Sequence, residues 1–169
     1  AQARDRPARV NAEFTNDASG RWDAGRLPVR RLALELQARP DDLATLFVQK
    51  FDVQVGSAQQ PAGSLSGRGR WTKDGWTFDA RLSELQPALL DSRAPAMTLS
   101  GPLTASGPTQ RILERGVDVR AEIAGRFAGA GPLRVVQLSL QGRAARDRIE
   151  LRSFKAAAGG TRIDAKGLA

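Results

Sequence analysis

Two short runs of the chain carry side chains that could do chemistry: the adjacent carboxylates of Asp41 and Asp42, and the sequence Gly67-Arg68-Gly69-Arg70. Paired carboxylates can share acid–base work, but the side chains of neighbouring residues point apart in a helix or a strand. We therefore expect one of the two aspartates to cap a helix. Glycine–arginine repeats occur in segments that bind single-stranded nucleic acid. Here the repeat alternates like a strand, which places both arginines on its polar face, and we expect a structural role.

The composition narrows the chemistry further. The 169 residues include no His, Cys or Tyr. This excludes imidazole and thiolate metal sites, cysteine and serine–histidine nucleophiles, disulfides and c-type haem attachment. Carboxylates, hydroxyls, Lys and Arg remain, and no acid, base and nucleophile among them converge. The sequence therefore predicts a protein that is not an enzyme and that has no catalytic residues, no metal and no cofactor.

The charge balance is basic, with a net charge of +8 from 26 basic and 18 acidic residues. Such a balance can indicate a nucleic-acid or anionic-membrane partner. The arginines stand singly on alternate strand positions without interleaved aromatic residues, so we expect a solvated polar face and no nucleic-acid partner. No run approaches the ~18 apolar residues of a membrane-spanning helix. Membrane contact is expected only through parts of a parent protein outside this segment.

Alternation of apolar and polar residues with a period of two is the main local signal, and it predicts antiparallel β-strands with short connections. About nine strands are expected, at residues 8–14, 32–38, 65–71, 76–82, 97–105, 117–123, 136–140, 149–154 and 163–165. A change of parity within the eighth predicts a bulge near Arg152-Ser153.

One region breaks this alternation. Leu43, Leu46, Phe47 and Phe51 fall at helical spacing after Pro40-Asp41-Asp42, which predicts an amphipathic helix at about 41–51. The following residues, 53–62, are rich in Gln, Ser and Gly and are expected to form a loop with some extended character. The sequence thus predicts a β-rich chain with one short helix.

The most informative hairpin lies on either side of Lys73-Asp74-Gly75. Asp-Gly is a favoured pair for a two-residue type I′ turn. With Asp74 and Gly75 as the loop, Trp71 would face Phe78 and Arg70 would face Asp79. Since opposed residues share a sheet face, this register gathers the apolar side chains on one side.

A weak repeat accompanies the strands. Leu65-Ser66-Gly67, Leu99-Ser100-Gly101 and Leu140-Gln141-Gly142 each lie on an alternating strand, at intervals of 34 and 41 residues. Such intervals are typical of repeat architectures. The first residue is not Met, and the last residues directly follow a strand-like run. We expect residues 1–169 to be a single β-rich segment of a longer, repeat-built protein.

An apolar sheet face has to be covered by a second sheet, by closure into a barrel or by a ligand with its own hydrocarbon. The predicted lining is mainly aliphatic, which favours a groove that side chains do not fill. The pattern predicts a mainly β, antiparallel fold and leaves two arrangements open: a β-sandwich, or an elongated curved sheet with an apolar concave face. The predicted groove lining is Leu32, Leu34, Leu36, Trp71, Trp76, Phe78, Leu82, Leu99, Val119, Ile123, Leu138, Leu140, Ile149 and Ile163.

Several of these stretches resemble a known family. The runs Val136–Gly142, Arg148–Leu151 and Gly159–Gly167, together with the hairpin from Gly63 to Leu82, are similar to the repeats of the TamB and AsmA-like family of Gram-negative envelope proteins. The resemblance covers most of residues 30–169. It implies a taco-shaped β-sheet with an apolar interior and no catalytic residues, in a periplasmic protein anchored in the inner membrane.

The resemblance also implies a function. Members of this family are linked to phospholipid movement toward the outer membrane, so phospholipid acyl chains are the expected ligand. TamB-type proteins also work with a TamA-like outer-membrane partner of the Omp85 class in assembling autotransporters and other outer-membrane proteins. Two alternatives stay open: a module that binds partner proteins by β-strand augmentation, and an AsmA-like lipid-homeostasis protein.

Overall fold

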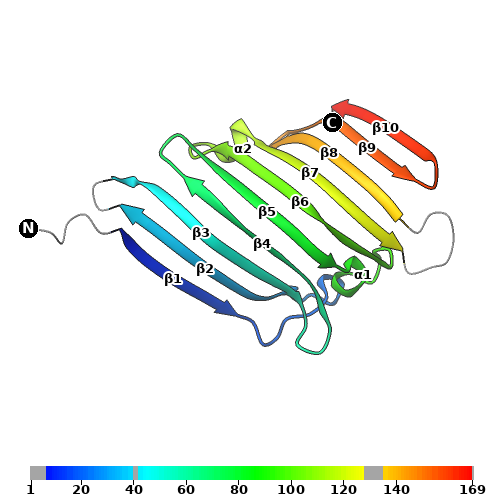
Figure 1. The fold of residues 1–169 in the computed structure, drawn as a ribbon, viewed down its shortest axis with the longest axis horizontal. Helices are drawn as coiled ribbons and strands as arrows, with labels where there is room; N and C mark the ends of the chain where they lie inside the picture. Colours follow the sequence, from blue (N-terminus) through cyan, green and yellow to red (C-terminus); the bar gives the residue numbers. More distant parts are fainter. Residues whose placement is uncertain (1–6, 40–41, 128–134, 169) are drawn as a thin grey trace, which may run out of the picture.

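The computed structural model describes residues 7–39, 42–127 and 135–168, and it places ten antiparallel strands in one sheet (Figure 1). Each strand pairs with its neighbours in the sequence, so the sheet order follows the chain from β1 to β10. The strands are β1 (Ala8–Thr15), β2 (Val29–Arg39), β3 (Asp42–Gly56), β4 (Pro61–Trp71), β5 (Gly75–Leu85), β6 (Met97–Pro108), β7 (Val117–Phe127), β8 (Val135–Ala145), β9 (Arg148–Ala158) and β10 (Thr161–Leu168). Between them lie three single-turn helices: η1 (Trp22–Ala24), α1 (Pro87–Leu90) and α2 (Ile112–Arg115). The expected fold class is confirmed: the chain is mainly β, antiparallel and elongated, and the sheet does not close into a barrel.

The described residues form a single layer, so the β-sandwich alternative is wrong. Facing sheets bury the side chains between them. Here Val48, Phe51 and Ala62 are the buried apolar residues of the described chain. The accessible surface is 11764 Å², whereas a compact protein of 18.1 kDa exposes about 8,100 Å². This excess is what an open sheet without a second layer produces.

The predicted helix at about 41–51 is wrong in the described residues, because the chain from Asp42 onward forms strand β3. The register explains the misleading spacing. On β3, Val48 pairs with Gly69 and Phe51 pairs with Gly67, so the strand carries an extra residue between these two pairs. This β-bulge places Val48 and Phe51 on the same face although they are three residues apart. An i, i+3 spacing within a bulged strand thus resembles helical periodicity. Asp41 lies outside the described residues.

Strand β3 also accounts for the tenth strand, since nine were expected. Residues 53–62 were expected to form a loop with some extended character: the loop covers 57–60, while β3 extends to Gly56 and β4 begins at Pro61. The expected bulge near Arg152 is confirmed. Gln141 pairs with Ser153 and Gly142 with Leu151, which leaves Arg152 as the extra residue of β9.

The predicted register of the β4–β5 hairpin is wrong by two residues. Trp71 pairs with Trp76, and Arg68, not Arg70, pairs with Asp79. The two-residue loop is Lys73-Asp74, because the hydroxyl of Thr72 binds the flanking residue: Thr72 Oγ1 donates to the Gly75 carbonyl at 2.8 Å and accepts from the Gly75 N–H at 3.1 Å. A shift of two preserves side-chain parity. The predicted faces are therefore correct although the predicted partners are not.

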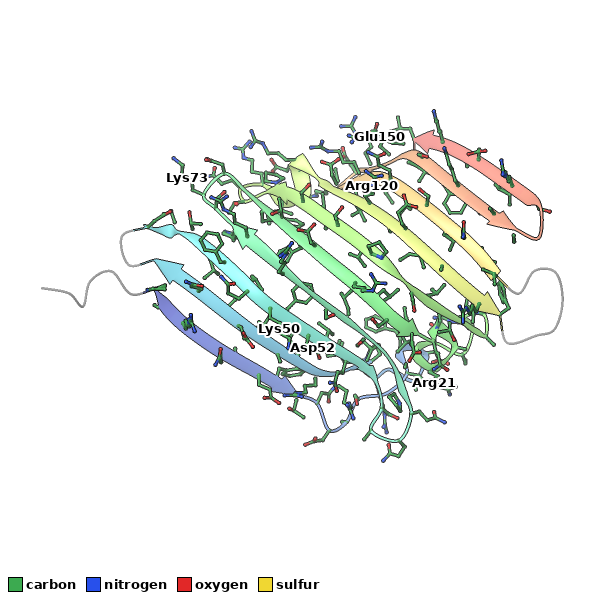
Figure 2. The ribbon with its side chains drawn as sticks, in the orientation of Figure 1. Arg21, Lys50, Asp52, Lys73, Arg120 and Glu150 are labelled. Atoms are coloured by element: carbon green, nitrogen blue, oxygen red, sulfur yellow. The ribbon has the colours of Figure 1, made fainter. Side chains whose placement is uncertain are left out.

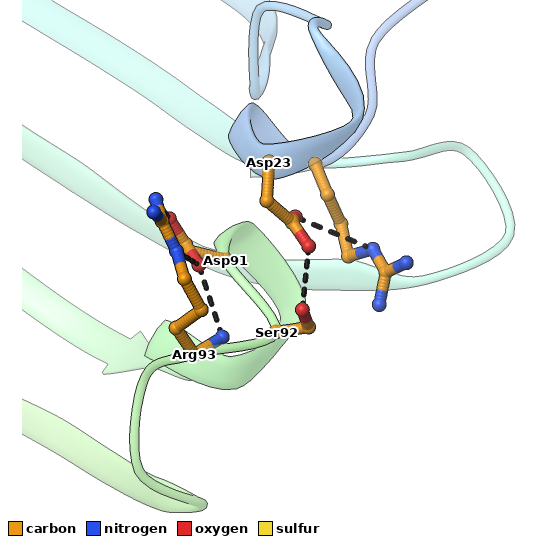
Figure 3. Close-up of polar contacts among 5 residues, drawn as sticks. Asp23, Asp91, Ser92 and Arg93 are labelled. Carbon is orange, nitrogen blue, oxygen red and sulfur yellow. Dashed lines mark hydrogen bonds and ion pairs between the residues drawn. The ribbon is translucent and has the colours of Figure 1, made fainter.

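One end of the sheet is tied together by two connections that are far apart in the sequence. The segment between β1 and β2 contains η1, and it meets the connection that follows α1 (Figure 3). Ser92 Oγ donates a hydrogen bond of 2.5 Å to Asp23 Oδ2, and this bond lowers the pKa of the Asp23 carboxyl. In the same connection, hydrogen bonds from Arg93 lower the pKa of Asp91 to about 2.

Candidate functional site

The candidate site is the apolar face of the sheet, defined by the cross-strand register. Opposed residues share a face, so a row of partners can be followed from one edge strand to the other. One such row is Phe14, Leu32, Val53, Leu65, Leu82, Gly101, Ile123, Leu138, Ala156 and Ile163. We call the surface that contains this row, and the parallel rows of the same parity, the apolar face.

All fourteen residues of the predicted groove lining lie on the apolar face. Leu34 and Leu36 pair with Phe51 and Val48 on β3, and Leu82 pairs with Leu65 on β4. The remaining members follow from the same register across β5 to β10. They form one continuous surface that spans the sheet from β2 to β10.

The sequence reasoning missed part of this surface. Val48, Phe51 and Val53 belong to it, although the sequence pattern around them predicts a helix or a loop. Leu103 pairs with Ala80, and Phe154 pairs with Leu140, so both also lie on the apolar face. The alternation alone was enough to include Leu103. Phe51 could not have been found in the same way, because its parity is set by the bulge in β3.

An aromatic cluster occupies the apolar face over β3 to β5. Phe51 and Phe78 meet edge-on with ring centroids 5.9 Å apart, and Phe78 lies 5.5 Å from Trp76. Trp76 in turn stacks on Trp71 at 6.5 Å. Such pairs add stability beyond the area that they bury. The sequence predicted three of the four members.

Two glycines let these rings lie against the backbone of β4. A Cβ atom on Gly67 would be 2.9 Å from the ring of Phe51, and one on Gly69 would be 2.4 Å from the ring of Phe78. The repeat Gly67-Arg68-Gly69-Arg70 therefore has a structural role: its glycines accept aromatic rings on one face and its arginines point to the other.

Large apolar side chains stay exposed along this face. Val10 and Phe14 on β1 expose 55% and 48% of their surface, and Ile149 and Ile163 on β9 and β10 expose 61% and 55%. No layer of the described chain covers them. Their exposure means that the apolar face is open to a ligand or a partner.

The opposite face is polar and charged. The register places Lys50 and Asp52 on β3, Arg120 on β7 and Glu150 on β9, all labelled in Figure 2, on this face. One hollow, with a volume of about 540 Å³, spans β7 to β10. It is lined from the polar face by Glu122, Ala124, Gln137, Ser139, Lys155, Ala157, Arg162 and Asp164, and from the apolar row by Ile123, Leu138, Ala156 and Ile163. The hollow therefore shares Ile123, Leu138 and Ile163 with the predicted groove lining.

Within the described residues, no group of three or more acidic side chains gathers in a way that could hold a metal ion. The helices in this part of the chain are too short to cross a membrane.

Comparisons with protein-family models, with curated proteins and with solved structures find no match to this chain.

Proposed function

We propose that the apolar face is a groove for phospholipid acyl chains, and that the chain is a non-enzymatic segment of a TamB-like protein of the Gram-negative envelope. The observation that carries this proposal is the apolar face itself, which continues across ten strands and is left uncovered by the described chain. On this proposal the segment lies in the periplasm within a protein anchored in the inner membrane. It passes phospholipid toward the outer membrane, and with an Omp85-class partner it also serves the assembly of outer-membrane proteins.

The size of the apolar face supports a lipid ligand. Ten strands at a spacing of about 4.8 Å, each about 11 residues long, make a face of roughly 1,600 Å². The largest apolar patch on a typical monomer measures about 300–600 Å². An apolar surface several times larger requires an apolar ligand or partner to shield it from water. Hydrocarbon chains are such a ligand, since each buried methylene contributes about 0.8 kcal/mol.

The chemistry of the face supports transport more than tight binding. Its side chains are mainly Leu, Val, Ile and Ala with interspersed Gly, and they provide contact area without directional hydrogen bonds. Outside the aromatic cluster of β3 to β5, an acyl chain would therefore find similar sites from strand to strand. Binding that is weak and uniform along a surface allows the ligand to move and to be released.

Photo-crosslinking from matched positions tests the proposal. A photoreactive residue would replace Phe78 or Leu138 on the apolar face and, as controls, Asp79 or Gln137 on the polar face. In cells that carry the protein in the periplasm, we expect phospholipid adducts from the first pair only, identified by mass spectrometry. Adducts with protein alone, or equal lipid adducts from both faces, would overturn the proposal.

A second candidate function is supported by the edges of the sheet. Every residue of the edge strands β1 and β10 is exposed, and within the described chain neither strand has a neighbour on its outer side. Such edges can capture an extended segment of a partner protein by strand augmentation. A proline in β10 at an amide that points away from β9 should block client assembly and leave lipid transport intact. Loss of both activities would show that the edge has no separate role.

A further inference from the structure

A cluster of arginines lies on the polar face at the end of the sheet near α2, on the side opposite the proposed groove. It surrounds a hollow of about 260 Å³. In Figure 2 the label of Glu150 marks this region. The hollow is lined by Glu114, Arg115, Arg143, Ala145, Arg148, Glu150 and Arg152. We call this group of residues the basic corner.

Two of these arginines are held in place by a carboxylate between them. Asp118 Oδ2 lies 3.3 Å from Arg143 Nη1, and Asp118 Oδ1 lies 3.1 Å from Arg152 Nη1. Arg152 also contacts Glu150 at 3.3 Å, and Arg143 Nε donates to the Arg115 carbonyl at 3.1 Å. These contacts join the end of α2 to strands β7, β8 and β9. They fix the directions of two guanidinium groups at the rim of the hollow.

The other two arginines, Arg115 and Arg148, form no ion pair within the described chain. Both are exposed and both line the hollow. The corner therefore combines two oriented guanidinium groups with two whose charges are not neutralised locally. Four arginines face three carboxylates here, those of Glu114, Asp118 and Glu150, which leaves an excess of positive charge.

We propose that the basic corner binds the phosphate group of a phosphate ester. Guanidinium groups present parallel N–H donors that match phosphate oxygens, and such charge-assisted bonds are about twice as strong as neutral ones. A tetrahedral phosphate offers oxygens in several directions and can accept from Arg115, Arg148 and their oriented neighbours together. A planar carboxylate has two oxygens and fits a corner of this kind less completely. The site is separate from the proposed groove and does not depend on it.

The phosphate group can come from a lipid headgroup or from a soluble phosphate ester. Ile149 lies between Arg148 and Glu150 in the sequence, but it faces the apolar side and exposes 61% of its surface. A lipid chain on the apolar face near Ile149 would bring its headgroup to the same end of β9. The two sources are distinguished by experiment.

The first measurement titrates the protein with inorganic phosphate at constant ionic strength and follows backbone amide shifts by NMR. We expect shifts concentrated at residues 114–118 and 143–152. The double variant Arg115→Gln/Arg148→Gln should weaken phosphate binding about tenfold, as expected for the loss of two exposed charge contacts that solvent screens. The matched control Arg9→Gln/Arg68→Gln removes two exposed arginines from other strands and should change the affinity less than twofold. Neither pair of side chains carries a described ion pair, so both variants should keep the native spectrum.

The second measurement adds vesicles of phosphatidylcholine alone or with phosphatidylglycerol and follows binding by flotation. Phosphate binding together with vesicle binding that requires Arg115 and Arg148 supports a lipid headgroup as the ligand. Phosphate binding without such vesicle binding supports a soluble phosphate ester. Absence of localised shifts with phosphate, or an equal loss in the Arg9/Arg68 control, would overturn the proposal.

Discussion

Replacing Phe51 and Phe14 in turn by Ala provides a direct test of the open apolar face. Both rings lie on this face, but Phe51 is 9% exposed and Phe14 is 48% exposed. Removing a buried Phe costs about 3–5 kcal/mol, since the transfer free energy and the cavity both count. Full burial of a Phe side chain contributes about 1.5–3 kcal/mol to stability. Replacing a half-exposed Phe by Ala should therefore destabilise the protein by about 1 kcal/mol. We therefore expect Phe51→Ala to destabilise the protein by about 2 kcal/mol or more beyond Phe14→Ala.

Urea unfolding followed by circular dichroism measures this difference. With a slope of about 2 kcal/mol per molar urea, the two midpoints should differ by about 1 M. Val48→Ala and Val10→Ala form a second matched pair, at 7% and 55% exposure. Ile149→Ala tests an exposed residue on β9, which is not an edge strand. If substituting the exposed residues destabilises the protein as much as substituting their buried counterparts, the apolar face is covered in solution. That result would refute the open apolar face.

Three further predictions follow from the same structure. Gly67→Ala should lower the melting temperature, because the new Cβ would lie 2.1 Å from a carbonyl oxygen of β5. The control Gly167→Ala places no atom within 4 Å of its new Cβ and should leave the melting temperature unchanged. Equal effects of the two substitutions would contradict the close approach of Phe51 and β5 to Gly67. The folded-state pKa of Asp91 is about 2, below the value near 3.9 of an unfolded chain. The ionised Asp91 carboxylate therefore stabilises the fold above about pH 4, and this stabilisation is lost as the pH falls toward 2. An NMR titration of this carboxyl with a midpoint near 3.9 would contradict the prediction. An acyl chain brominated along its length should quench the fluorescence of Trp76. A Trp22→Phe variant should still show this quenching, because Trp22 lies off the sheet. Loss of the quenching in that variant would argue against binding at the aromatic cluster.

The sequence determined the class of the fold and the composition of both faces. A period of two is compatible with a strand and not with a helix, so each alternating run assigned its side chains to a face without knowledge of the neighbouring strand. The β4–β5 hairpin shows the strength of this rule, because its register moved by two residues and every side chain kept its face. The change of parity on either side of Arg152 similarly located a bulge before any partner strand was known.

Other features depended on contacts that the local sequence does not contain. The bulge in β3 places Val48 and Phe51 against Gly69 and Gly67 of β4, and without those partners the same spacing indicates a helix. The hydroxyl of Thr72 fixed the turn at Lys73-Asp74 although Asp-Gly has the stronger general preference.

Only the tertiary structure decided that the apolar face stays uncovered. Alternating strands have the same apolar face in a sandwich, a barrel or an open sheet. The alternation indicates which face is apolar, but it does not indicate what packs against that face. The choice is made by the path of the whole chain. Here each strand pairs with its neighbours in sequence and the described chain never returns across the apolar face.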